Sequence, residues 1–387
     1  MTKTARALAV PPGAQYFLDY SEMPDALAVK LEELAFEHGR YFDSYVVTEP
    51  NRHYFWSSGE SAVAGCWLVG KYLHIAGGLI CEPGCRTAFA EELIAFARLN
   101  NLTVSVFMVD RMDADLFESL GFQVTKYGEE VSVGLPNLSW SGRKLEWVRR
   151  QVNYVKRHDV VFEELTSPDV YAEEREIDLD EIDEVSRESL AGTVQNGVIP
   201  FFEGQLLPGH IHRRRIFVAR RTDAELGSRI EGFVVCNPFG NGRQWAIEMY
   251  RKREDAIRGT IPYLFHQTIN QLKQEGAELV SLSPVPALRC ETPLPNDSSL
   301  VRRILSFWYN HWNYVFDVPG IYHFKSRFRP EFSDIFVCVY PKATVGSVRA
   351  YAICSRSLDI RHKALLRAIW HRAKSRKTLS KAKTLKK

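Results

Sequence analysis

The chain has 387 residues, a length that a single core seldom supports, so we expect two domains. Hydrophobic residues make up 45% and charged residues 25% of the sequence, a balance that excludes a disordered chain. The longest apolar runs are strand-sized, and the first ten residues are too polar for a signal peptide, so we predict a cytoplasmic protein.

The seven cysteines are scattered, with no CxxC pair and no matching set of histidines. Cys81 and Cys85 are the only close pair, and one pair cannot complete a tetrahedral zinc site. We therefore expect reduced, structural thiols and no metal site.

The formal net charge of +3 is unevenly distributed. From Arg361 to Lys387 there are eleven Lys or Arg residues and no Asp or Glu, so the rest of the chain carries a net charge of about −8. This basic tail also contains Ile369 and Trp370 on a helical pattern, which predicts docking to an anionic membrane surface or to RNA. A solvated terminus is the alternative interpretation.

The first half of the chain predicts alternating strands and helices. Apolar residues at helical spacing indicate a helix over residues 25–37, and an amphipathic helix is expected over residues 87–100. A further short helix ends at Gly121, and strand patterns occur at residues 44–47, 54–57, 62–69, 72–75, 102–109, 123–127 and 130–134. We assign residues 1–141 to a first lobe.

A basic helix over residues 142–162 is predicted to connect the lobes. Its cations, interleaved with Trp147 and Tyr154, are Arg143, Lys144, Arg149, Arg150, Lys156 and Arg157. Cations and aromatic rings on one helix predict contacts with nucleic-acid phosphates and bases. A plain exposed helix is the alternative.

The second half repeats the order of the first. Strand patterns occur at residues 216–219, 229–235, 244–250, 278–282, 322–324 and 335–340, and helices are expected over residues 261–275 and 299–310. The alternation predicts an α/β fold of two lobes, with mixed sheets flanked by helices. The second lobe spans residues 163–345 and carries the candidate site, and residues 346–387 form the basic tail.

Two short blocks interrupt patterns that are otherwise typical of a core. One is Glu248-Met249-Tyr250-Arg251, at the end of a predicted strand, and the other runs from Tyr322 to Pro330. Both place cations among aromatic side chains at a boundary between strand and loop, where a phosphate or an ester oxygen can be held. We predict that these blocks carry the chemistry.

The geometry of these blocks follows from strand alternation. Three residues separate Glu248 from Arg251, so on a straight strand they face opposite sides, and a bend after Met249 is needed for them to converge. Lys325 and Arg327 alternate in the expected strand and are predicted to share one face. The alternatives are a surface ion pair for the first block and a solvated face for the second.

Four motifs, read in order, resemble the soluble synthase domain of the phosphatidylglycerol lysyltransferase family over about Leu27 to Lys342. They are Gly142-Arg143-Lys144-Leu145 with Val148-Arg149 and Asn153, Glu248-Met249-Tyr250-Arg251, Glu275-Gly276-Ala277 to Ser283-Pro284, and Phe324-Lys325-Ser326-Arg327-Phe328-Arg329-Pro330. Glu248 and Arg327 stand where the family commonly has aspartate and lysine, which leaves the amino acid and the lipid open.

The resemblance implies two tandem lobes of the GNAT acyltransferase type that move an amino acid from aminoacyl-tRNA onto a lipid hydroxyl. It implies no cofactor beyond aminoacyl-tRNA as co-substrate, and an anionic membrane lipid as partner at the inner face of the cytoplasmic membrane. The catalytic residues are then expected to be Glu248, Arg251, Lys325 and Arg327. The expected substrate-binding residues are Arg143, Lys144, Arg149, Arg150, Tyr322 and Arg329.

Two other functions remain open at this point. A GNAT-type enzyme using acyl-CoA needs successive backbone N–H groups at a helix start to cradle the pyrophosphate. Arg258-Gly259-Thr260-Ile261-Pro262 offers one glycine and a proline without an N–H, which is a poor cradle. A non-catalytic module that binds RNA or membrane is the other alternative.

Overall fold

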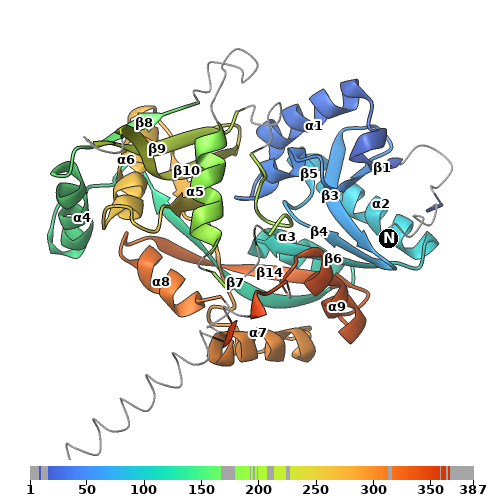
Figure 1. Cartoon of the computed structure of the whole chain (residues 1–387). Helices are drawn as coiled ribbons and strands as arrows, with labels where there is room; N and C mark the ends of the chain where they lie inside the picture. Colours follow the sequence, from blue (N-terminus) through green and yellow to red (C-terminus); the bar gives the residue numbers. More distant parts are fainter. Residues whose placement is uncertain are drawn as a thin grey trace, which may run out of the picture.

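The computed structural model describes residues 8–9, 16–166, 179–191, 193–194, 197, 199–206, 213–223, 227–312, 316–357, 359–362 and 365–366. Figure 1 shows two halves of mixed α/β structure joined by long central strands. The predicted α/β class, with a mixed sheet flanked by helices, is confirmed.

The described residues form one continuous sheet rather than two separate ones. Its main path runs in the order β1-β2-β3-β4-β6-β14-β7-β12-β11-β10-β9-β8. The strands are β1 (Tyr16–Asp19), β2 (His53–Trp56), β3 (Ala62–Val69), β4 (Tyr72–Ile75), β5 (Ile80–Cys81), β6 (Thr103–Val109), β7 (Gln123–Gly134), β8 (Val160–Glu164), β9 (Arg215–Asp223), β10 (Gly227–Phe239), β11 (Gln244–Lys252), β12 (Leu279–Ser281), β13 (Val285–Pro286) and β14 (Glu331–Tyr340).

Helices cover both faces of this sheet. The α-helices are α1 (Asp25–His38), α2 (Arg86–Leu99), α3 (Arg111–Ser119), α4 (Glu146–Lys156), α5 (Leu179–Ala191), α6 (Thr260–Gln274), α7 (Ser299–His311), α8 (Val318–Ser326) and α9 (Val345–Cys354). Short 3₁₀ turns are η1 (Tyr20–Glu22), η2 (Ser44–Thr48), η3 (Pro83–Cys85) and η4 (Arg143–Leu145).

Strand β14 joins the two halves of the molecule. It follows the second half in sequence, yet it lies between β6 and β7 and pairs antiparallel with both. Phe336 and Cys338 enter the core beneath α2 and α3, whereas Ile335, Val337 and Val339 enter a core on the opposite face. This alternation buries the strand on both sides, so the halves cannot separate without losing core packing.

In the second half, α4 and α6 cover one face of the sheet and α5 covers the other. Val148, Val152 and Val155 recur at helical spacing on α4 and pack in the core that includes Leu264 and Ile247. Ile182 and Val185 of α5 pack against the opposite face. The surface of β10 and β11 beneath α5 carries the candidate site.

Two predicted strands are not observed as strands. Residues 44–47 form the 3₁₀ turn η2, and residues 322–324 belong to helix α8. Pro319 lies in the first turn of α8, and the Asp317 side chain caps the helix by accepting a hydrogen bond from the Gly320 N–H at 3.0 Å. The aromatic residues Tyr322 and Phe324 therefore lie in a helix, not in a strand.

The segment predicted as a basic tail begins with a packed helix. α9 starts with a capping box between Thr344 and Ser347, and it buries Ala350 and Cys354. The Arg361 guanidinium donates to the Leu190 carbonyl at 2.6 Å. Residues 367–387, which hold most of the basic charge, lie outside the described residues.

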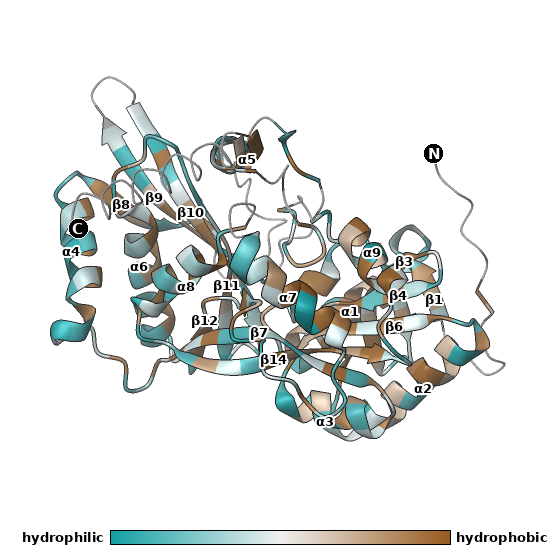
Figure 2. Cartoon of the chain, turned by 90° about the horizontal axis from the view of Figure 1, so that it is seen from below, coloured by the Kyte–Doolittle hydropathy of each residue, from teal (hydrophilic) through white to brown (hydrophobic). Residues whose placement is uncertain are grey.

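Within the described part of the chain, none of the helices combines the length and the hydropathy that a bilayer crossing requires. Figure 2 shows hydrophilic and hydrophobic residues interspersed along the helices seen from below.

Candidate functional site

A β-bulge in β11 brings Glu248 and Arg251 to the same side of the sheet. In the pairing of β10 with β11, Val235 opposes Met249 and Cys236 opposes Ile247, so Glu248 is the extra residue. The predicted convergence of Glu248 and Arg251 is therefore present, through a bulge at Glu248 instead of a bend after Met249. Both side chains reach the segment at residues 203–204.

Glu248 is nearly buried, with 7% exposure, and hydrogen-bond donors reach both carboxylate oxygens. Nδ2 of Asn237 donates to Oε2 at 2.7 Å, and the backbone N–H of Gly204 donates to Oε1. Oδ1 of Asn237 is itself buried and lacks a hydrogen-bond partner among the described residues. This acceptor is unsatisfied, so a ligand that brings a hydrogen-bond donor beside Glu248 would supply its partner.

Arg251 is equally buried and forms an ion pair. Its Nη2 lies 2.9 Å from Oε2 of Glu203, and Nη1 donates to Oγ of Ser186 on α5 at 3.2 Å. Burial raises the pKa of Glu203, the Arg251 charge opposes that rise, and the Glu248 charge adds to it. Arg251 is thus a buried cation that pairs with Glu203 and lies near the buried carboxylate of Glu248.

The first half of the molecule contributes buried charges to the same place. Glu49, just after η2, lies 2.7 Å from Nη1 of Arg214, and both side chains are fully buried. Burial raises the pKa of Glu49, the Arg214 charge lowers it, and the Glu248 charge raises it further. Arg52 is also buried and donates to the Pro200 carbonyl at 3.4 Å. The site therefore lies at the junction of the two halves.

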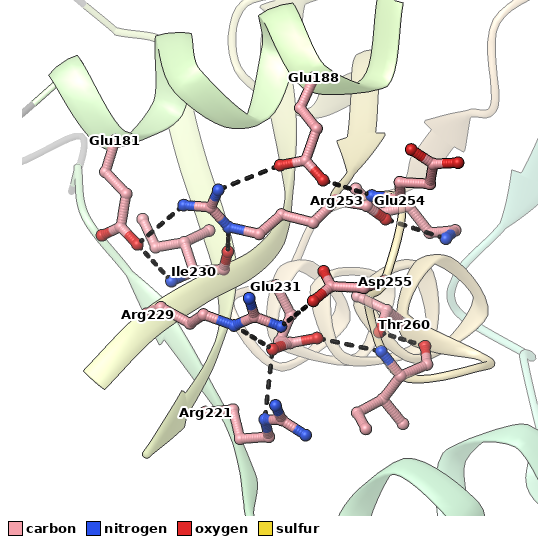
Figure 3. A network of polar contacts seen from close by, with 12 residues as sticks. Glu181, Glu188, Arg221, Arg229, Ile230, Glu231, Arg253, Glu254, Asp255 and Thr260 are labelled. Carbon is pink, nitrogen blue, oxygen red and sulfur yellow. Dashed lines mark hydrogen bonds and ion pairs between the residues drawn. The ribbon is translucent and has the colours of Figure 1, made fainter. Parts of the chain in front are cut away.

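Arg253 holds helix α5 to the sheet, and Figure 3 shows its guanidinium reaching Glu181 and Glu188. The Arg253 guanidinium lies 3.0 Å from Glu184 and 3.1 Å from Glu188, and its Nε donates to the Ile230 carbonyl at 2.8 Å. Nearby, the fully buried Glu231 pairs with Arg221 and Arg229. These contacts fix the helix that presents Ser186 to Arg251.

Lys325 lies close to β11 but is not in contact with the Glu248 pair. Its Nζ donates to the carbonyls of Ser283 and Pro284 at 2.7 and 3.2 Å, and Oγ of Ser283 donates to the Ile247 carbonyl at 2.6 Å. Among the described residues, no hydrogen bond or ion pair joins Lys325 to Glu248 or Arg251.

Lys325 and Glu130 are buried ionisable groups that influence each other. Burial lowers the pKa of Lys325 to about 7, although the Glu130 charge opposes this shift. Burial likewise raises the pKa of Glu130 to about 7, against a hydrogen bond from Ser281 and the Lys325 charge. Both groups titrate near neutral pH, which suits proton transfer or charge stabilisation.

The prediction that Lys325 and Arg327 share one face of a strand is wrong. Both lie at the end of α8, where two residues differ by about 200° around the helix axis. Lys325 points into the interior, whereas Arg327 contacts the His323 ring at 2.9 Å and lies over the Trp147 ring.

Two other predicted binding residues lie outside the buried cluster. Arg329 is exposed and donates to the Lys144 carbonyl at 3.3 Å. The Tyr322 hydroxyl accepts from Nη2 of Arg289 at 3.2 Å. Neither residue contacts Glu248 or Arg251 in the described part of the chain.

The predicted basic helix over residues 142–162 is shorter than expected, because η4 and α4 cover residues 143–156 and residues 160–162 belong to strand β8. Its cations divide into two groups. Arg149 donates to the carbonyls of Trp140 and Gly142 at 2.6 and 2.7 Å, so it supports the turn before the helix. Arg143 and Lys144 are exposed, and Arg150 pairs with Glu146 at 2.5 Å while remaining 75% exposed.

The outer side of α4 borders an open hollow of about 740 Å³. Its lining is rich in cations and consists of Arg150, Gln151, Asn153, Tyr154, Lys156, Arg157 and Arg258. A concave surface with this charge suits a polyanion. Of the predicted substrate-binding residues, only Arg150 lines it.

Six residues that complete the buried cluster were not predicted from the sequence: Glu49, Arg52, Ser186, Glu203, Gly204 and Asn237. Their only local signal is a charged or polar residue beside apolar ones, which many surface positions share. In the described residues, no group of three or more His, Cys, Asp or Glu side chains is arranged to hold a metal ion.

Comparisons with known proteins agree on one family. The sequence model of the family described as phosphatidylglycerol lysyltransferase, C-terminal, matches residues 32–339. The phosphatidylglycerol lysyltransferase of Bacillus subtilis is 24% identical over 336 residues, which cover 85% of this chain and 36% of that protein. The enzyme of that name from Staphylococcus aureus strain N315 is 21% identical over 339 residues, covering 84% and 38%. The chain therefore spans little more than a third of these relatives.

Two solved structures share the fold. A C-terminal domain assigned to a lysylphosphatidylglycerol synthetase of Agrobacterium fabrum has a TM-score of 0.69 at 19% identity, covering 87% of this chain and 98% of that one. The L-PGS structure from Bacillus licheniformis has a TM-score of 0.67 at 20% identity, covering 88% and 98%.

Proposed function

Since the chain belongs to the family of phosphatidylglycerol lysyltransferase C-terminal domains, we propose that it transfers an aminoacyl group from aminoacyl-tRNA to a hydroxyl of a membrane lipid such as phosphatidylglycerol. The observation that carries the proposal is the bulge in β11, which directs Glu248 and Arg251 to one buried site at the junction of the halves. The proposed reaction needs no cofactor beyond aminoacyl-tRNA.

The proposed reaction exchanges one ester for another. The lipid hydroxyl oxygen bonds to the aminoacyl carbonyl carbon, and the bond from that carbon to the terminal ribose oxygen of the tRNA breaks. The lipid hydroxyl loses its proton and the ribose oxygen gains one, so charge and atoms balance. Because the donor ester is already activated, much of the rate enhancement comes from orienting the two substrates. Orientation lowers the activation barrier by several kcal/mol.

We assign the proton transfer to Glu248 and the lipid phosphate to Arg251. Glu248 accepts the hydroxyl proton when the hydroxyl takes the place of the Gly204 N–H, which donates to Oε1 in this structure. Arg251 is a buried cation beside it, and charge-assisted hydrogen bonds to phosphate are strong. The unsatisfied Oδ1 of Asn237 is available for the amino group or a second hydroxyl.

We assign Lys325 to stabilising charge near the reacting ester. It is held by two carbonyls of the loop that touches the Ile247 carbonyl, one residue before Glu248. A cation near a developing oxyanion contributes roughly 3 kcal/mol.

We assign the hollow on α4 to the donor tRNA. Arg150, Lys156, Arg157 and Arg258 offer phosphate contacts, and the Tyr154 ring is 39% exposed for stacking. Arg327, which lies over Trp147 near the start of α4, belongs with this donor surface instead of the buried cluster.

The acyl-CoA alternative has less support at the start of α6. A side chain at Gly259 would lie 3.1 to 3.3 Å from Gln151 and Val155, so α4 packs directly against this helix start. Ile257, just before it, donates its N–H to the buried Glu231 carboxylate at 3.0 Å. A carboxylate beside the helix start repels a pyrophosphate.

Lipid analysis tests the proposed function. Purified protein, aminoacyl-tRNA carrying a labelled amino acid and vesicles of phosphatidylglycerol are expected to give a lipid heavier by one aminoacyl residue, detected by mass spectrometry. Absence of the product with every aminoacyl-tRNA supplied, and in cells that express the protein, would contradict the proposal. Uncharged tRNA and vesicles of phosphatidylcholine serve as controls.

We further propose peripheral attachment to the inner face of the cytoplasmic membrane through the basic tail. Most of that tail lies outside the described residues, so this stays a prediction. Removing residues 367–387 is expected to weaken sedimentation with anionic vesicles, most strongly at low salt, because each Lys or Arg adds about 1 kcal/mol near such a surface. Unchanged sedimentation would count against the tail as an anchor.

A further inference from the structure

Residues 199–206 form a segment, called here the inner segment, that covers the buried site. In Figure 1 it is the yellow-green stretch between the two halves of the molecule. Phe201 is fully buried and anchors the segment against the rings of Phe107 and Tyr351.

The inner segment contacts each buried charged group of the cluster. The Pro200 carbonyl accepts from Arg52, and the Gln205 N–H donates to Glu49 at 3.0 Å. Gly204 is packed so closely against the Arg214 guanidinium that an added side chain would clash with it. Glu203 and Gly204 bind Arg251 and Glu248, as described above.

Two consecutive residues of this segment present the groups that an acceptor lipid would present. Glu203 places an anion on Arg251, where the proposed lipid phosphate belongs, and Gly204 places an N–H donor on Glu248, where the proposed hydroxyl belongs. A phosphodiester that bears a hydroxyl a few bonds away carries the same pair of groups, an anion and a hydrogen-bond donor.

The inner segment satisfies the site only in part. Oδ1 of Asn237 and both Nε and Nη2 of Arg214 are buried without a hydrogen-bond partner among the described residues. Each such atom costs about 1–3 kcal/mol. A headgroup with several hydroxyls and phosphate oxygens offers the missing partners, whereas the backbone of Gly204 does not.

The position is also reachable from solvent. The Glu203 side chain is 32% exposed, while the Arg251 side chain behind it is 7% exposed. A ligand that approaches from the Glu203 side therefore meets this carboxylate first and Arg251 second.

We propose that the inner segment is a built-in competitor for the acceptor, and that a phosphodiester bearing a free hydroxyl displaces Glu203 from Arg251 and Gly204 from Glu248. The inference rests on the proposed function of this site. It adds that Glu203 and Gly204 must leave their partners before the acceptor binds. Displacement exchanges one ion pair for another, so it costs little electrostatic energy.

Binding of the soluble headgroup glycerophosphoglycerol tests the proposal, measured by calorimetry on the full chain. Glu203→Gln keeps the shape but removes the competing charge, and it is expected to tighten binding about tenfold, because the competent fraction of the protein rises. Glu60→Gln is the matched control, since it removes a carboxylate of similar exposure that pairs with Lys30 instead of Arg251. Binding by Glu203→Gln equal to that by Glu60→Gln, or weaker than wild type, would overturn the proposal.

A second variant acts through shape instead of charge. Gly204→Ala places a methyl group against the Arg214 guanidinium and pushes the segment off Glu248, so it is also expected to tighten headgroup binding. Weaker binding by both variants would show that the segment builds the site instead of competing for it. An equal gain for inorganic phosphate would reveal a general anion site and overturn the assignment to a lipid acceptor.

This readout separates the two proposals. Headgroup binding does not require aminoacyl transfer, so a protein that forms no aminoacylated lipid can still show the expected gain with Glu203→Gln. Conversely, transfer activity with no gain in headgroup binding would support the proposed function and contradict the role of the inner segment as a competitor.

Discussion

A buried carboxylate costs free energy unless donors reach its oxygens, and Glu248 illustrates how a site meets this requirement. One donor comes from the neighbouring strand through Asn237 and the other from the inner segment through Gly204. The second donor belongs to a segment that a ligand can replace, so the carboxylate is poised for exchange of partners.

Glu248→Gln tests the role of this carboxylate. The variant keeps the size of the side chain but cannot take up a proton, so aminoacyl transfer is expected to fall by about a hundredfold or more, the range of a general base. Initial rates with saturating aminoacyl-tRNA measure the effect. Full activity together with unchanged tRNA and vesicle binding would instead make the residue structural.

Lys325 gives the protein a stability that depends on pH. Because burial lowers its pKa from 10.5 to about 7, the unfolded state binds more protons than the folded state between these values. Stability contributed by this group therefore rises as pH increases from about 7 to about 10, by at most about 1.4 kcal/mol per pH unit.

Lys325→Met removes that dependence while keeping a similar length. We expect wild type to gain stability relative to Lys325→Met between pH 7 and pH 9, measured by urea unfolding at both values. The same difference at both pH values would mean that Lys325 is not held in a lowered-pKa state. Glu130 acts at lower pH. Because its pKa is raised from 4.5 to about 7, the stability that it contributes falls as pH rises between these two values.

Helix α5 has few buried apolar residues and depends on ionic contacts for its place. Ile182 and Val185 are its buried side chains in the described residues, and Arg253 joins it to β10 and β11. The position of Ser186 over Arg251 therefore depends on Arg253, which lies two residues after Arg251.

Arg253→Met is expected to loosen α5 and lower stability by about 1–3 kcal/mol, because it leaves carboxylates and the Ile230 carbonyl without their donor. Hydrogen exchange of amides in α5 should accelerate more than that in α6, whose core contacts are unaffected. Uniform acceleration throughout the protein would indicate global destabilisation instead of release of one helix. Arg243→Met, at a 67% exposed arginine, is the matched control.

The molecule has two charged regions, one on its surface and one in its interior. The hollow on α4 is lined by cations and open to solvent, whereas the Glu248 cluster is buried between the halves and contains charges of both signs. The proposed tRNA donor and the proposed lipid acceptor therefore have separate binding regions on this protein.

Charge removal on α4 is expected to affect only the donor. Lys156→Ala combined with Arg157→Ala should weaken aminoacyl-tRNA binding and lower the slope of log K against log salt by about one unit for each phosphate that is no longer neutralised. Binding of glycerophosphoglycerol should not change. A loss of headgroup binding, or a salt slope equal to that of wild type, would contradict a separate donor surface.

The local pattern of apolar and polar residues determined most of the helices and strands that were predicted correctly. Periodicity of apolar residues identified the helices at α1, α2, α6 and α7 and the long strands, because burial of one face requires that spacing. The block at Glu248 to Arg251 was recognised as unusual because charges interrupt a core strand. The amphipathic pattern at residues 322–324 was misassigned, since three residues fit either period and the cap at Asp317 decided for a helix.

Tertiary structure alone decided how the site is assembled. The bulge at Glu248 depends on how β10 pairs with β11, and the contacts of Glu49 with Arg214 and of Arg52 with Pro200 join segments about 150 residues or more apart in the sequence. Lys325 and Arg327 are two residues apart, yet one is buried and the other lies over Trp147. A sequence specifies which residues can be buried, but partners from distant segments determine which buried charges meet, because that choice is made by long-range packing.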